Sequence, residues 1–214
     1  MAFCSTHSWG TEYRCRRESR IFNERTEWQL NPDVVSQIRD LWVNPEIDLF
    51  ATRVNTQLAI FASWKPDPEA THIDAFTIDW SRYNFYCFPP FSLISRCLRK
   101  VEMEKAEGIL IAPIWPTQVW WPPMLRLLIR HPVALPQQKR LLQLPNTSKI
   151  HTLYPKLVLM ACYISGDPLK QEECQNQLVT SLWPPGDLVP RSNIKSISKN
   201  GGTFVLKGKL ITIS

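Results

Sequence analysis

The sequence predicts an α/β protein with an open, mostly parallel sheet and flanking helices. Helix and strand patterns follow one another in the order helix, strand, strand, helix, strand, helix, strand, which is typical of this class. Residues 109–114 are apolar without interruption, as expected for a parallel strand that is buried on both faces. The domain is expected to span residues 26–164, between loose N- and C-terminal tails.

The first predicted element is a helix that begins at Asn31 and ends before Pro45. The Asn31 side chain can cap the helix, and Pro32 suits its first turn because the ring fixes φ. Apolar residues then recur at helical spacing. Residues 1–25 are polar and have no clear period, so they are expected to be the remnant of a preceding region.

Short apolar runs predict strands at residues 47–51, 73–76 and 84–88. The third run ends at Pro89 and Pro90, which lack a backbone N–H and fix φ, so the pair forms a rigid corner. A loop of about 20 residues separates the first two runs, and a loop of that length is usually functional or disordered. Its aromatic residues argue against disorder.

The later elements follow the same patterns. An amphipathic run predicts a helix that is closed by Gly108, and the continuous apolar run beyond it predicts a strand. After residue 165 the chain turns polar, so residues 165–214 are expected to form a flexible linker or tail. In chain order, the elements expected in between are a helix at 93–106, a strand at 109–114, a Trp- and Pro-rich segment at 115–123, a short helix at 124–129, and strands at 141–142 and 157–163.

Composition excludes several classes of protein. The formal charge of +6 is compatible with nucleic acid as a partner without being diagnostic. The six cysteines are scattered and include no Cys-x-x-Cys pair, so we expect reduced, mostly buried thiols in an intracellular protein, nuclear or cytoplasmic, rather than a zinc site or disulfides. No apolar run approaches about 20 residues, so no membrane span is expected.

The strand order places a candidate site at one rim of the sheet. Right-handed crossovers would bring Asp48, residues 88–91 and residues 113–115 to the same edge, where open α/β sheets bind ligands. An acid at the end of a first strand commonly binds a ribose hydroxyl, although a capping role or a pairing with Arg53 is equally compatible with the position of Asp48. No glycine occurs between Gly10 and Gly108, so a phosphate-binding glycine loop is excluded.

Two further groups of side chains are candidates. Asp67, Asp74 and Asp79 bracket turns, and we interpret them as caps rather than as metal ligands, so no metal site is predicted. Aromatic residues beside prolines could stack on an extruded base, although core packing would explain any one of them. The residues concerned are Tyr86, Phe88 and Phe91, with Trp115, Trp120 and Trp121 opposite them.

Several of these motifs, in this order, resemble the phage-type DNA adenine methyltransferases. More specifically, residues 26 to about 132 resemble the methyltransferase-like segment of DIRS-type retrotransposon polyproteins. The matching pieces are Thr26-Glu27-Trp28, Asp48-Leu49-Phe50-Ala51-Thr52-Arg53 with Asn55, Asp79-Trp80, Phe88-Pro89-Pro90-Phe91-Ser92-Leu93-Ile94 and Trp115-Pro116-Thr117-Gln118. Residues 17–20 also resemble the end of the RNase H that precedes this segment, with Arg16 and Arg17 in place of its Ala-Asp.

The resemblance implies a Rossmann-like fold, a cofactor and a set of site residues. Asp48, Phe50, Ala51 and Asp74 would border a pocket for S-adenosylmethionine, and Phe88, Pro89, Pro90 and Phe91 would form the catalytic corner that holds the target base. Relatives of this kind place Asp or Asn where Phe88 stands, and that side chain accepts a hydrogen bond from the adenine amino group. Phe88 has no acceptor. Loss of one positioned contact of this type typically lowers the rate by about 100- to 1,000-fold.

The resemblance therefore predicts a catalytically impaired methyltransferase-like domain that binds nucleic acid, such as DNA, or plays a structural role. Other segments of a retroelement polyprotein would be its partners. Two alternatives stay open. One is an active S-adenosylmethionine-dependent DNA adenine methyltransferase, in which a backbone carbonyl replaces the missing side-chain acceptor, and the other is an unrelated small α/β interaction domain.

Overall fold

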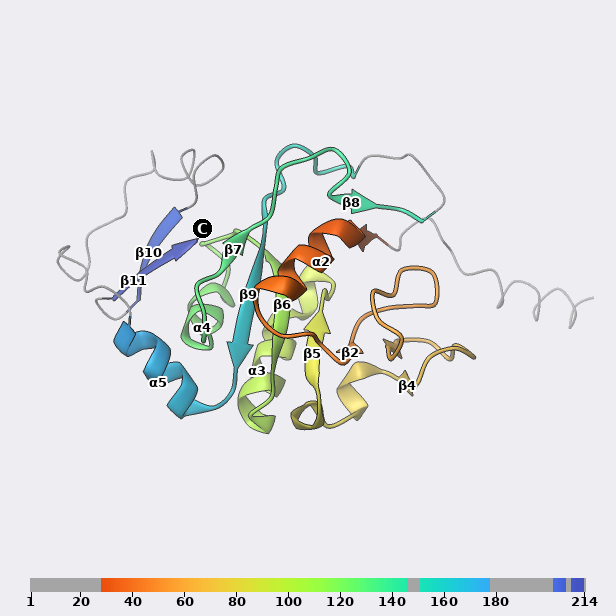
Figure 1. Cartoon of the computed structure of the whole chain (residues 1–214), viewed down its shortest axis with the longest axis horizontal. Coiled ribbons are helices and arrows are strands. Elements are labelled where there is room, and N and C mark those ends of the chain that lie inside the picture. The colour runs from red at the N-terminus through yellow and green to blue at the C-terminus, as the bar shows by residue number, and fades with distance from the viewer. Residues whose placement is uncertain (1–27, 146–150, 178–201, 207–208, 214) are drawn as a thin grey trace, which may run out of the picture.

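The computed structural model describes residues 28–145, 151–177, 202–206 and 209–213 of the chain. It is an α/β fold in which helices cover both faces of a five-stranded mixed sheet (Figure 1). The sheet has the strand order β2-β5-β6-β9-β7. The predicted N-terminal remnant at residues 1–25 lies outside the described residues.

The middle of the sheet is parallel and its far side is antiparallel. Strand β5 (Asn84–Cys87) pairs in parallel with β2 (Ile47–Asp48) on one side and with β6 (Glu107–Pro113) on the other. Strand β9 (Leu159–Ser165) runs against β6 over its full length, and β7 (Val133–Ala134) runs against β9. The antiparallel pairings hold more residues than the parallel ones, so the sheet is mixed and not mostly parallel as predicted.

The reversal of β9 has a simple physical cause. A parallel neighbour requires a crossover, usually through a helix, to bring the chain back to the same end of the sheet. No helix lies between β7 and β9 in the described residues; the chain instead forms β8 (Leu142–Gln143) and returns from the opposite end. Strand β8 pairs with β1 (Gln29–Leu30).

Two further short strands extend the parallel edge. Strand β3 (Ala62–Ser63) pairs in parallel with β4 (His72–Ile73). Phe61, next to β3, forms a parallel bridge with Asp48 in β2. The strand predicted at residues 73–76 is therefore shorter than expected, and the 3-10 helix η1 (Ala75–Thr77) replaces its second half. Strands β4, β3, β2 and β5 all end at the same rim.

The helices bury the apolar faces that the sequence predicts. Helix α2 (Pro32–Leu41) begins as expected, because Asn31 Oδ1 accepts a hydrogen bond from the Asp33 amide at 2.9 Å. Helix α3 (Ile94–Glu104) follows the 3-10 turn η3 (Phe91–Leu93). The other helices are η2 (Trp80–Arg82), α4 (Trp121–Arg126) and α5 (Pro168–Gln177).

Gly108 does not close helix α3, which ends at Lys105 in the left-handed conformation (φ 53°). Gly108 instead lies in β6 beside Phe85 of β5. A Cβ at this position would lie 2.3 Å from the Phe85 carbonyl oxygen. The glycine is therefore explained by the close approach of two strands.

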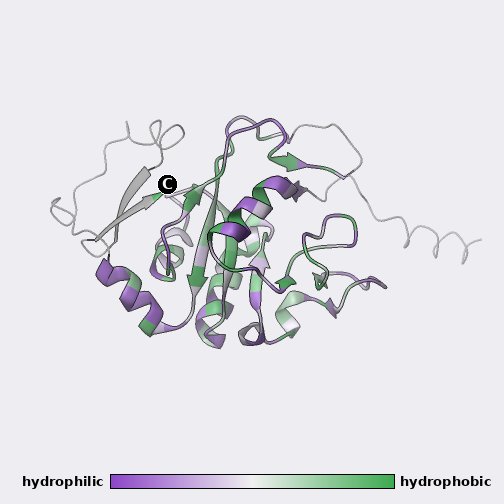
Figure 2. Ribbon diagram, in the orientation of Figure 1, coloured by the Kyte–Doolittle hydropathy of each residue, from purple (hydrophilic) through white to green (hydrophobic). Residues whose placement is uncertain are grey.

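Alternating residues of the sheet form two apolar layers, as the period of a strand requires. In β6, Leu110 and Ala112 pack with α3 and α4 on one face, and Ile109 and Ile111 pack with α2 on the other. Strand β6 is correspondingly hydrophobic in Figure 2, whereas α5 is largely hydrophilic and has no buried residue. Among the described cysteines, Cys87, Cys97 and Cys162 are buried and free, and Cys174 is half-buried and free.

The C-terminal region differs from the predicted loose tail. Besides α5, it contains an antiparallel hairpin of β10 (Gly202–Leu206) and β11 (Lys209–Ile213). The Ile213 side chain is fully buried in the layer that contains α3 and α4. A polar segment thus still contributes to the core through one apolar residue. None of the helices that the structure describes has both the length and the apolar character that a membrane crossing requires.

Candidate functional site

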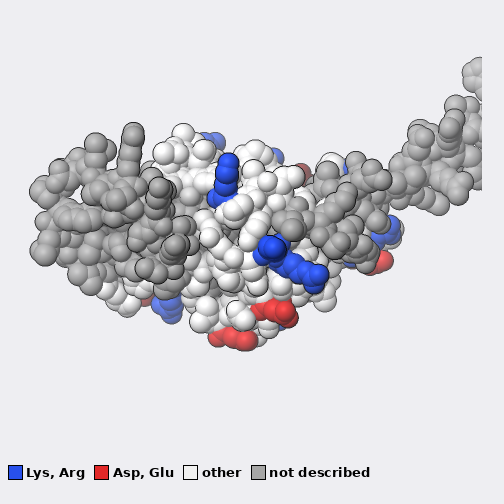
Figure 3. Space-filling view, turned by 90° about the horizontal axis from the view of Figure 1, so that it is seen from above, with Lys and Arg blue, Asp and Glu red and all other residues white. Residues whose placement is uncertain are grey.

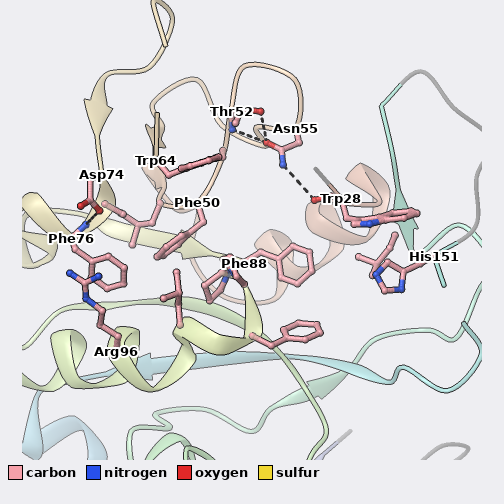
Figure 4. Close-up of a pocket in the computed structure, with 18 residues that line it drawn as sticks. Trp28, Phe50, Thr52, Asn55, Trp64, Asp74, Phe76, Phe88, Arg96 and His151 are labelled. Atoms are coloured by element: carbon pink, nitrogen blue, oxygen red, sulfur yellow. Dashed lines mark hydrogen bonds between the residues drawn. The ribbon is translucent and has the colours of Figure 1, made fainter. Parts of the chain in front are cut away.

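A cavity of about 700 Å³ opens at the carboxyl ends of β2, β3, β4 and β5 (Figure 4). Each of these strands contributes the residues that directly follow it, and α3 contributes residues of its start. Open α/β sheets bind their ligands at this edge. From the predicted site the cavity brings together Phe50, Ala51 and Asp74 with Phe88, Pro89, Pro90 and Phe91.

Asp48 lies beneath the wall of this cavity and does not line it. Its carboxylate is buried, and it accepts hydrogen bonds from the backbone amides of Gln57 at 3.0 Å and Phe50 at 3.4 Å. Burial raises its pKa to about 7, and the two amide hydrogen bonds only partly offset that rise. The predicted contact with a ribose is therefore wrong for Asp48. The acid instead fixes both ends of the loop at residues 50–57.

The same loop is tied to the segment that precedes α2. Asn55 Oδ1 accepts hydrogen bonds from the Thr52 amide at 2.7 Å and the Thr52 hydroxyl at 3.2 Å, and Asn55 Nδ2 donates to the Trp28 carbonyl at 3.5 Å. Gln57 Nε2 donates to the Leu30 carbonyl at 2.7 Å. These bonds tie one wall of the cavity to the segment that precedes α2.

Asp74 is the charged acceptor of the cavity. It follows β4 in a left-handed conformation (φ 57°), which is uncommon for a residue with a side chain and tends to occur at functional sites. Its amide donates to the Ser63 carbonyl at 2.7 Å, and its Oδ1 accepts from the Phe76 amide at 3.0 Å. Among the described residues, its Oδ2 has no hydrogen-bond partner.

Aromatic rings form much of the remaining wall. At the Asp74 end, Phe50 packs edge-on against Phe76 with ring centroids 5.6 Å apart, and Trp64 is 65% exposed at the rim. The Arg96 guanidinium lies 3.7 Å from the centre of the Phe76 ring. Figure 4 shows these residues on one side of Phe88, with Trp28 and His151 on the other. Flat ligands can therefore contact rings at both ends of the cavity.

The far end of the cavity contains a neutral histidine. His151 packs edge-on against Trp28, with ring centroids 4.6 Å apart. Burial lowers the pKa of His151. Its Nδ1 accepts a hydrogen bond from the Leu153 amide at 3.2 Å, so the ring proton of the neutral form belongs on Nε2. His151 therefore offers the cavity a donor and no charge at neutral pH.

The tryptophans that were predicted to stack on a base lie elsewhere. Trp120 and Trp121 are 5% and 4% exposed and pack in the core around α4, so the prediction is corrected for both. Trp115 packs edge-on against Phe91 at 5.1 Å and supports the corner from behind. Trp28 and Trp64 line the cavity in their place, and the sequence pointed to them only through the resemblance at Trp28 and the unusually long loop that holds Trp64.

The predicted capping role of the acids agrees with the geometry. Asp79 Oδ1 accepts from the Ser81 amide, and Asp67 accepts from the amides of Arg53 and Glu69. Within the described part of the chain, no three His, Cys, Asp or Glu side chains come together in a way that could hold a metal ion.

In the described part of the face seen from above in Figure 3, positive charge does not form a continuous band. Lys and Arg side chains appear there in small separate groups among mostly uncharged atoms. A protein that follows a long phosphate backbone usually presents a basic stripe. The described part of this face shows no such stripe.

None of the known protein-family models matches this chain, and no curated protein matches it at a significant level.

Proposed function

We propose that this chain binds an adenosine-containing ligand of the S-adenosylmethionine type and transfers methyl groups to adenine poorly or not at all. One observation carries the proposal: a single cavity of about 700 Å³ combines aromatic walls with an open carboxylate at the carboxyl edge of parallel strands. Ligand sites are typically concave and mostly apolar, with a few polar groups that fix the orientation of the ligand.

The residues present fit an adenosine moiety. The rings of Phe50 and Trp64 can stack on or flank a purine, and base–aromatic stacking contributes about 1 to 3 kcal/mol per base. The Phe76 ring already stacks on Trp80 and under the Arg96 guanidinium. Asp74 Oδ2 can accept a hydrogen bond from a ribose hydroxyl, because Oδ1 already serves the Phe76 amide. The volume lies within the range of about 300 to 1,000 Å³ that small-molecule sites occupy.

The corner at residues 88–91 supports binding more than catalysis. S-Adenosylmethionine supplies an activated methyl group when it is bound. The Phe88 side chain lines the cavity without any polar atom, so it cannot accept a hydrogen bond from the amino group of a target adenine. The rings of Phe88 and Phe91, 6.4 Å apart, can still contact a base.

The proposal also covers the ancestry and the context of the chain. The parallel strands β3, β2, β5 and β6, of which the first three end at the cavity, support a Rossmann-like, methyltransferase-like origin for this part of the sheet. The motif order at residues 26–132 supports a place in a retroelement polyprotein, with DNA and neighbouring polyprotein segments as partners.

Calorimetric titration of the full chain with S-adenosylmethionine tests the proposal, with Asp74→Asn as the variant. Asn tolerates positive φ and can keep the cap on η1, so the variant removes the charge with little strain. We expect affinity to fall about tenfold or more. Asp79→Asn is the matched control, because Asp79 caps η2 in the same way and does not line the cavity.

Heat of binding that responds to Asp74→Asn and not to Asp79→Asn supports the site. Absence of heat at millimolar ligand contradicts it and favours the interaction domain. Methyl transfer to adenine-containing DNA by the unaltered chain would favour the active methyltransferase instead, and Phe88→Asn should raise any residual rate.

A further inference from the structure

We propose that Arg96 receives an anionic group of the ligand, a carboxylate or a phosphate, so that the cavity selects acidic derivatives of adenosine over neutral ones. This inference rests on the proposed function and assigns the part of the ligand beyond its nucleoside.

Arg96 is oriented by an aromatic ring on the wall of the cavity. It lies in the first turn of α3, and its guanidinium stacks 3.7 Å from the centre of the Phe76 ring, as Figure 4 shows. Stacking occupies the flat face of a guanidinium and leaves its N–H groups free at the edge. Those N–H groups match the two oxygens of a carboxylate or a phosphate.

No acid in the described part of the chain pairs with the Arg96 guanidinium. Among the described residues, Arg96 forms neither a salt bridge nor a hydrogen bond. Lys100, one turn further along α3, provides an internal comparison. It also approaches an aromatic ring, that of Trp80 at 5.7 Å, but it pairs with Glu104. The helix thus supplies a partner for one cation and not for the other.

The position of Arg96 on the helix also favours an external anion. A cation in the first turn of a helix faces the positive end of the helix dipole, which is unfavourable. An anion beside Arg96 would reverse that unfavourable interaction. Asp74 lines the same end of the cavity, and no ion pair joins it to Arg96.

The two charges therefore define a ligand with two different ends. Asp74 suits a hydroxyl donor, and Arg96 suits an anion. An adenosine whose 5′ substituent ends in a carboxylate or a phosphate has both groups. A purely structural role for Arg96, that of covering Phe76, predicts no such selectivity.

The test compares three ligands by calorimetry on the full chain. S-Adenosylhomocysteine carries a carboxylate, adenosine monophosphate carries a phosphate, and 5′-methylthioadenosine carries neither. We expect at least one acidic ligand to bind about tenfold more tightly than methylthioadenosine. Tighter binding of only one acidic ligand would show whether Arg96 binds the carboxylate or the phosphate. Tighter binding of both would show that Arg96 accepts either anionic group.

Arg96→Gln should abolish this preference and leave methylthioadenosine binding within about twofold. Arg96→Lys, which keeps the charge without the planar fork, should retain part of it. Arg99→Gln is the control, because Arg99 is exposed on the same helix and does not line the cavity.

Equal affinity for all three ligands would overturn the assignment of Arg96 and leave the proposed function standing. Equal losses of affinity for the acidic ligands in Arg96→Gln and Arg99→Gln would also overturn the assignment of Arg96, because such losses would reflect the change in net charge alone. Absence of binding by all three ligands would refute the proposed function and this inference with it.

Discussion

The two ends of the central sheet use their polar side chains in opposite ways. At the amino end, Tyr163 accepts a hydrogen bond from Asn84 Nδ2 at 3.0 Å and donates to Glu107 Oε1 at 2.7 Å, and Glu107 also pairs with Lys170. In this network only Asn84 Oδ1 is buried without a partner. At the carboxyl end, Asp74 Oδ2 and the Arg96 guanidinium face a cavity with no protein partner among the described residues.

This difference distinguishes the polar groups that stabilise the fold from those that are available to a ligand. Polar groups that satisfy one another stabilise the fold and need nothing further. Polar groups that are held in place with open donors or acceptors are available to a ligand. Changes at the amino end should therefore alter stability, and changes at the cavity should alter binding.

The largest expected effect is a pH dependence of stability, and it arises at Asp48, which lies beneath the cavity wall and does not line the cavity. Asp48 has a pKa of about 7 in the folded chain against an ordinary value of 3.8, because burial disfavours its charge. The folded state therefore holds the proton more tightly than the unfolded state. The stability contributed by this group is fully present below about pH 4 and is lost as pH rises to about 7, by up to about 4 kcal/mol.

Chemical denaturation between pH 4 and pH 8 measures this effect. Burial, and then the charge of Asp48, raise the pKa of the neighbouring Tyr86. Burial, and then Cys97, raise the pKa of Cys87, so both groups stay neutral over this range. Asp48→Asn should flatten the curve. An equally steep curve in that variant would assign the pH dependence to another group.

The second-largest expected effect is a loss of stability caused by a substitution at the amino end of the sheet. Tyr163→Phe removes the hydroxyl that links Asn84 to Glu107 and leaves both without that partner. The free energy of unfolding should fall by about 1 to 3 kcal/mol. Affinity for S-adenosylhomocysteine should stay unchanged, and a tenfold loss of affinity would break the separation between the two ends.

The smallest effect on stability is expected from Trp64→Ala. Because Trp64 is 65% exposed, its removal should change the free energy of unfolding by less than about 0.5 kcal/mol. Loss of a stacking ring should nevertheless weaken ligand binding by about tenfold. Trp42→Ala is the matched control, since Trp42 stacks on Tyr163 at 5.6 Å and lies at the amino end. Equal effects of the two substitutions on affinity would contradict the role of Trp64.

Local rules predicted much of the fold. The Asn31 cap, the apolar spacing of α2 and α3 and the proline corner after β5 all appear where the sequence placed them. The direction of β9 could not be predicted in the same way. It depends on whether a helix intervenes before the strand, and a short apolar run does not reveal that.

Only part of the cavity lining could be predicted from the sequence. The strand-end and proline motifs of the sequence predicted part of the cavity, because the structure brings together Phe50, Ala51, Asp74 and the proline corner. Trp28, Arg96 and His151 come from distant segments that only the fold unites. Trp120 and Trp121 looked like a stacking pair in the sequence, but α4 turns them into the core.

The most direct test is a calorimetric titration of the full chain with S-adenosylhomocysteine, repeated for Asp74→Asn and Tyr163→Phe. We predict saturable binding at one site, weakened about tenfold by the change at the carboxyl end and untouched by the change at the amino end. A chain that gives no heat at millimolar concentrations, or that loses binding equally with both substitutions, would contradict the assignment of the cavity as a ligand site.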